Sequence, residues 1–120
     1  MKHRMIPLAL LAAPLSVQAS APTLPPELQT GLRCAALFSI VAGEQARQGA
    51  NDWPPLQQRG REFFVRVSAR AMDMGKLDRP ALQALIQAEA AGLRTNDRRA
   101  ALKAPCLAML EANLPVPAGR

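Results

Sequence analysis

Cys34 and Cys106 are the two cysteines of this 120-residue sequence, and more than half of the chain lies between them. A bond between them would close a long loop, which stabilises a folded chain by about 4 kcal/mol on the chain-entropy model. Neither cysteine belongs to a CxxC motif, and both have apolar neighbours. We therefore expect a structural disulfide. The alternative is a pair of free thiols, one of them reactive.

Residues 1–19 have the pattern of a signal peptide. They comprise a basic start at residues 2–4, an apolar stretch at 5–15, and small residues at Val17 and Ala19. We expect cleavage after Ala19, with Ala21 as the alternative. The apolar stretch is shorter than the roughly 20 residues that span a bilayer, so we expect no membrane span after cleavage. The protein is therefore predicted to be periplasmic or extracellular, where disulfides persist.

Residues 26–113 are expected to form a single helical domain, after an extended lead-in at 20–25 and before a flexible tail at 114–120. Cleavage removes two of the 15 basic side chains and none of the 9 acids, which leaves a net charge of about +4. A nucleic-acid surface needs clustered basic groups with stacking aromatics, and the sequence has 3 Phe, 1 Trp and no Tyr. We expect no nucleic-acid partner.

Proline and glycine divide the domain into helices. The first is expected over 26–48 and is apolar around most of its circumference, which is typical of a central helix. The second is expected over 54–74, with Asp52 as its cap. Its core face follows a spacing of three and four residues. This face consists of Leu56, Gly60, Phe63, Val67, Ala71 and Met74.

The third helix is expected over 79–94, after Asp78, and the fourth over 97–113. Pro105 divides the fourth, so this helix either kinks there or restarts as a fifth segment. Both versions place Cys106 on an apolar face, and Cys34 points to the inward side of the first helix. The fold class is predicted as all-α, a small four-helix bundle whose first and last helices are joined by one disulfide.

The sequence lacks most catalytic chemistry. Its one histidine, His3, leaves with the signal peptide, so a His-based triad or metal site is excluded in the mature domain. No GxGxxG, Walker or HExxH motif is present. A hydroxyl and carboxylates such as Glu44, Glu62, Asp73 and Glu89 remain as catalytic candidates. We expect no cofactor, no metal and no enzymatic activity.

Four features have a functional interpretation beside a structural one. Trp53, with the apolar pair Val65 and Met72, is a candidate contact for a partner protein, although Trp53 could equally cover the end of the bundle. Two side chains on inward faces, Gln45 and Glu89, are candidates for lining a pocket, or for hydrogen bonding and ion pairing within the core.

A strip of arginines on the second helix is a candidate contact for an anionic partner. It consists of Arg59, Arg66 and Arg70, and Glu62 and Asp73 lie at helical spacing from it. The alternative is a solvated face whose charges neutralise one another.

Several segments together resemble a family of small exported, all-helical bacterial proteins with one cysteine pair. These segments are Leu32–Phe38, Trp53–Leu56, Arg59–Arg66 and Pro105–Leu107. The resemblance implies an exported helical domain with a Cys34–Cys106 pair, and it brings no activity with it. The plan is also similar in outline to acid-stress periplasmic chaperones, without a shared motif.

The favoured hypothesis is a small exported protein-interaction or envelope-associated module, whose partner is another envelope protein. The alternative is a helical domain that binds a small ligand or lipid, with an enclosed apolar pocket between the first two helices. The third is an enzyme that uses two converging carboxylates.

Overall fold

The structure is a computed structural model that describes residues 24–115. Within this range the chain forms four helices and no strands. They are α1 (Pro26–Ala46), α2 (Arg59–Gly75), α3 (Arg79–Ala91) and α4 (Asn96–Asn113). A disulfide between Cys34 and Cys106 joins α1 to α4, which confirms the predicted fold class. The predicted signal peptide, the lead-in up to residue 23 and the tail from 116 lie outside the described residues.

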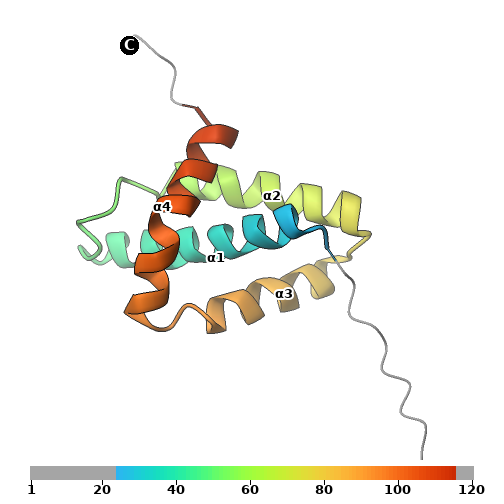
Figure 1. Ribbon diagram of the computed structural model, residues 1–120, viewed down its shortest axis with the longest axis horizontal. Helices are drawn as coiled ribbons and strands as arrows, with labels where there is room; N and C mark the ends of the chain where they lie inside the picture. Colours follow the sequence, from blue (N-terminus) through green and yellow to red (C-terminus); the bar gives the residue numbers. More distant parts are fainter. Residues whose placement is uncertain (1–23, 116–120) are drawn as a thin grey trace, which may run out of the picture.

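Helix α1 is the centre of the molecule, as its apolar circumference predicted. Figure 1 shows α2 and α3 on either side of it, while α4 crosses it steeply from the end of α3 towards the start of α2. All three other helices contact α1, whereas α3 and α4 do not pack on each other within the described chain. Burial on several sides accounts for the run of apolar residues from Cys34 to Phe38.

The interface between α1 and α2 is closely packed. The rings of Phe38 and Phe63 meet edge to face, with centroids 5.2 Å apart. Two glycines let the helix backbones approach: a Cβ at Gly31 would lie 3.1 Å from Cγ1 of Val67, and one at Gly60 would lie 3.3 Å from Cβ of Phe38. The two helices therefore meet through interlocking side chains.

The second helix begins at Arg59 and not at residue 54, so this part of the prediction is wrong. The two prolines and the buried Leu56 instead form an irregular segment before the helix. Asp52 does not cap the helix, because the N-cap position belongs to Gln58. Met74 was assigned to the core face, but its side chain is 59% exposed, because the contacts of α2 with the core end near Ala71.

The start of α3 follows its sequence signal. The Asp78 carboxylate accepts a 2.9 Å hydrogen bond from the Ala81 amide, and α3 begins one residue after Asp78. Helix α3 ends at Ala91, three residues earlier than the expected 94. Helix α4 continues through Pro105 without restarting, which resolves the two alternatives for this segment.

Candidate functional site

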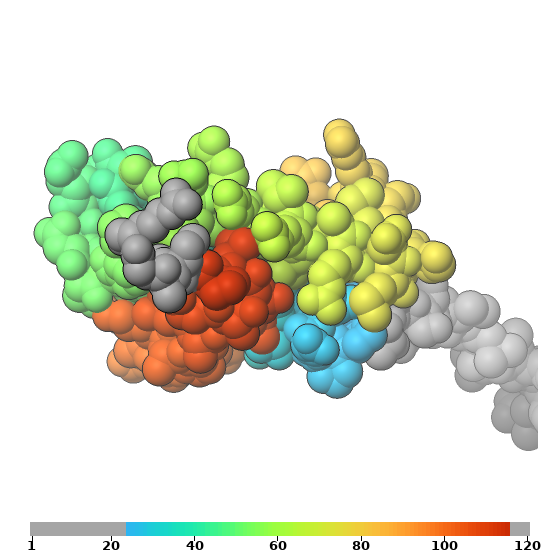
Figure 2. Space-filling view, turned by 90° about the horizontal axis from the view of Figure 1, so that it is seen from above, coloured from blue at the N-terminus to red at the C-terminus, as the bar shows by residue number. Residues whose placement is uncertain are grey.

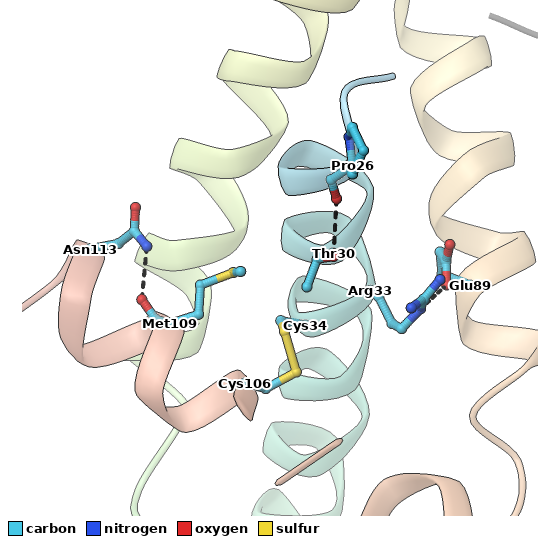
Figure 3. Close-up of a disulfide and its surroundings, with 8 residues drawn as sticks. All are labelled: Pro26, Thr30, Arg33, Cys34, Glu89, Cys106, Met109 and Asn113. Carbon is cyan, nitrogen blue, oxygen red and sulfur yellow. Dashed lines mark hydrogen bonds and ion pairs between the residues drawn. A yellow bond between two sulfur atoms is a disulfide. The ribbon is translucent and has the colours of Figure 1, made fainter. Parts of the chain in front are cut away.

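The disulfide is deep in the fold and has no solvent access. Cys34 and Cys106 are 1% and 0% exposed, and their Cα atoms are 5.2 Å apart, within the usual range for a disulfide. Figure 3 shows the bond between the middle of α1 and the second half of α4. A bond in this position fixes helix packing and offers no reactive sulfur to a substrate.

Glu89 forms an ion pair with Arg33, the residue next to Cys34 on α1. The Arg33 Nε donates to the Glu89 Oε2 at 2.9 Å, and both side chains are about one-third exposed. Consecutive helical residues point about 100° apart, so Arg33 reaches α3 while Cys34 reaches α4 (Figure 3). Glu89 is thus a link between α1 and α3.

Gln45, the second candidate pocket residue, supports the loop before α2. Its Nε2 donates to the Pro54 carbonyl at 2.9 Å, and its Oε1 accepts from the Leu56 amide at 3.0 Å. Gln45 lies twelve residues beyond Arg33 on α1, about 18 Å further along the axis. The structure therefore does not bring Gln45 and Glu89 together in one pocket.

Trp53 packs against the core and against Lys103 of α4. The Lys103 Nζ lies 5.1 Å from the ring centroid and donates at 2.6 Å to the carbonyl of Asp52. The neighbouring hollow of about 540 Å³ also contains Glu44 and Arg99, which pair at 2.5 Å. Trp53 therefore links the loop before α2 to α4. It lies in a different part of the molecule from Val65 and Met72.

The arginine strip of α2 is divided by its contacts. Arg59 binds α4, because its two terminal nitrogens reach Oε1 of Glu111 at 2.7 Å and the Leu114 carbonyl at 2.6 Å. Arg66 lines a shallow hollow beside Arg59, and Arg70 does not. In the described structure neither Arg66 nor Arg70 forms an ion pair within 4.0 Å. The expected neutralisation of their charges by Glu62 and Asp73 therefore does not involve close ion pairs.

Val65 and Met72 belong to an open apolar groove between α2 and α3, with a volume of about 610 Å³. In Figure 2, α4 (orange and red) covers one side of α2, and part of α3 (gold) emerges on the other. The α2 wall consists of Phe64, Val65, Ser68, Ala69 and Met72. The α3 wall consists of Arg79, Leu82, Gln83, Ile86 and Gln87.

The groove has no acidic residue in its walls, and Val65 at its edge is 60% exposed. Near its middle, Ser68 is 9% exposed, and its hydroxyl has no hydrogen-bond partner among residues 24–115. A buried polar group without a partner costs about 1–3 kcal/mol. An apolar residue of similar size in place of Ser68 would therefore make this part of the groove wall more stable.

The α3 side of the groove was not identified from the sequence. In the structure Leu82 is buried, while Ile86 is half-buried beside the groove. The available signal was the position of Val65 and Met72 outside the core face of the second helix. A second apolar side on one helix indicates a second packed or binding surface.

The metal-ligating side chains and the four candidate acids can be placed within residues 24–115. No group of three His, Cys, Asp or Glu side chains in residues 24–115 could hold a metal ion. Of the four candidate acids, Glu44 and Glu89 pair with arginines, and Glu62 and Asp73 lie about 16 Å apart along α2. Across the same range no helix has the length and apolar character needed to cross a membrane.

Comparisons with protein-family models, curated proteins and solved structures gave no match for this chain. The resemblance to small exported bacterial proteins therefore stays a prediction.

Proposed function

We propose that the protein is an exported interaction module, without catalytic activity of its own, that binds an amphipathic helix of an envelope protein in the groove between α2 and α3. The observation that carries this proposal is the groove itself, about 610 Å³ in volume and lined mainly by apolar side chains from two helices. Docking of an amphipathic helix into an apolar groove is a common mode of recognition.

The shape of the groove favours a helix over a small ligand. Small-molecule sites bury most of the ligand surface in a concave pocket. This groove is open to solvent, and the Val65 side chain at its rim is more than half exposed. A bound helix would cover Val65 and Met72 together, because these residues lie two turns apart on the same face of α2.

The alternative of a small-ligand or lipid-binding domain was tied to a pocket between the first two helices. Between these helices the Phe38–Phe63 contact and the tight approaches at Gly31 and Gly60 leave a hollow of about 260 Å³, smaller than the groove between α2 and α3. The groove between α2 and α3 is where an apolar ligand would find more room. Binding of a fatty acid there is the outcome that would favour this alternative.

Export is supported by two features. The disulfide is fully buried between α1 and α4, and such bonds persist in oxidising compartments. The N-terminal 19 residues have the composition of a signal peptide. Intact-mass measurement of the protein from its native host would test cleavage after Ala19 and the oxidation state of both cysteines.

The interaction is tested by a photo-crosslinking residue at Val65, compared with the same residue at Ala108, an exposed position on α4. We expect a discrete crosslinked product from Val65 in envelope extract, and its loss when Met72→Asp is added. Equal products from both positions, or products that Met72→Asp leaves unchanged, would contradict the proposal.

A further inference from the structure

Two arginines stand at opposite ends of the groove. Arg79 lines the end beside the turn between α2 and α3. Arg61 lines a smaller hollow of about 260 Å³ that shares Phe64 with the groove. It precedes Phe64 by nearly one turn of α2, on the side away from the turn to α3. Neither arginine forms an ion pair with any of residues 24–115. The walls of both hollows contain no acid.

Building on the proposed function, we infer that the partner helix is acidic at both ends of its apolar stripe, and that Arg61 and Arg79 bind these ends. Arg61 shares a face of α2 with Val65, Ser68 and Met72, and Met72 is near the turn that leads to Arg79. Arg61 and Met72 are eleven residues apart, which is about 16 Å and three helical turns along α2, and Arg79 lines the groove together with Met72.

The same geometry defines the partner. Two carboxylates eleven residues apart on a helix lie about 16 Å apart on nearly the same side, and apolar residues at positions three, four, seven and eight fill the space between them. Such a helix would place its apolar stripe on Val65 and Met72 and one carboxylate near each arginine. The overall positive charge of the chain favours the approach of an acidic partner.

A second copy of the chain fits the groove less well. A symmetric contact would bring the groove faces of both copies together, and their arginines would then face like charges. Arg79 lines the apolar groove and Arg61 lines the hollow beside it, so an acidic amphipathic helix complements both charge and apolar character. Anionic membrane is a separate class of partner, and the experiment distinguishes it.

The inference is tested with three synthetic helical peptides that share one apolar stripe. They carry Glu, Gln or Lys at two flanking positions eleven residues apart. Binding to the oxidised protein is measured by fluorescence anisotropy at low and high salt. We expect the Glu peptide to bind roughly tenfold more tightly than the Gln peptide at low salt, and the advantage to shrink at high salt.

Charge reversal then assigns the contact. Arg61→Glu combined with Arg79→Glu should invert the preference, so that the Lys peptide binds better than the Glu peptide. The matched control is Arg94→Glu combined with Arg98→Glu, two exposed arginines that do not line the groove. Equal affinity for the three peptides, or a control that inverts the preference as well, overturns the assignment of Arg61 and Arg79.

Failure of the underlying function has a different signature. If Val65→Asp with Met72→Asp leaves the affinity for all three peptides unchanged, the groove is not the binding surface. If vesicles that contain phosphatidylglycerol bind the protein in an Arg61- and Arg79-dependent way and the Glu peptide does not compete, the partner is a membrane and the inference of an acidic helix is wrong. Dimerisation that Val65→Asp abolishes would also overturn it.

Discussion

Reduction of the disulfide between Cys34 and Cys106 should remove a large part of the stability of this fold. The two cysteines are 72 positions apart, so the chain-entropy model gives a loss of about 4 kcal/mol at 25 °C. A domain of this size has a total free energy of unfolding of about 5–15 kcal/mol. The reduced protein should therefore be close to the limit at which it stays folded.

The measurement is urea unfolding of the protein before and after reduction, followed by circular dichroism at 222 nm. Reduction should lower the free energy of unfolding by about 4 kcal/mol and raise the slope with urea, because the open chain exposes more surface on unfolding. The control is the double variant Cys34→Ala with Cys106→Ala, in which reductant should change nothing. A loss below about 1 kcal/mol would refute the argument that closure of this loop stabilises the fold.

The part of the fold that loses stability on reduction is a second readout. On reduction α4 loses its covalent link to α1 and keeps the ion pair between Glu44 and Arg99, whereas α3 loses no contact and keeps the ion pair between Arg33 and Glu89. Hydrogen exchange should therefore accelerate more in α4 than in α3. Equal acceleration in both helices would show that the disulfide stabilises the whole bundle uniformly.

Four further substitutions have defined outcomes in the same unfolding assay. Lys76→Gly should stabilise the protein by about 1 kcal/mol, because Lys76 has a φ of 52° after the end of α2, and a loss would contradict this reasoning. Gly31→Leu should destabilise it by about 1–3 kcal/mol, because its side chain would collide with Val67, and no change would show that the helices can separate freely. Ser68→Ala should stabilise it by about 1 kcal/mol by removing an unpaired buried hydroxyl, and a neutral result would indicate that the hydroxyl bonds back to its own helix. Gln45→Ala should destabilise it by about 1–2 kcal/mol and shift the fluorescence of Trp53, since the loop before α2 loses its side-chain hydrogen bonds, and an unchanged emission maximum would count against this role.

The sequence predicted those parts of the fold that depend on local signals. The proline pair before α1 and Asp78 before α3 placed two helix starts within one residue. The pairing of Cys34 with Cys106 followed from composition and from the inward face of the first helix. For the two helix starts, the deciding residues and the structure they determine are neighbours in the sequence. The cysteine pairing needed no choice between partners, because the sequence has two cysteines.

The start of α2 was not predictable in this way. Residues 54–58 have the prolines of a first helical turn, but Gln45, from a different helix, holds them in an irregular segment. For the same reason, the sequence indicated one wall of the groove and not the other. Val65 and Met72 indicated a second apolar side on α2, while the α3 wall with Arg79 is set by the tertiary arrangement.

The long separation of Cys34 and Cys106 in the sequence also affects when the two cysteines can meet during synthesis. Synthesis proceeds at about 5–20 residues per second, so Cys34 is made roughly 4–14 s before its partner. During this interval α1, α2 and α3 can already associate, since none of them needs α4 to contact α1. With two cysteines in the sequence, no wrong pairing within the chain is available. Because Cys34 lies on the side of α1 that α4 covers, its thiol becomes fully buried only when α4 packs and Cys106 arrives.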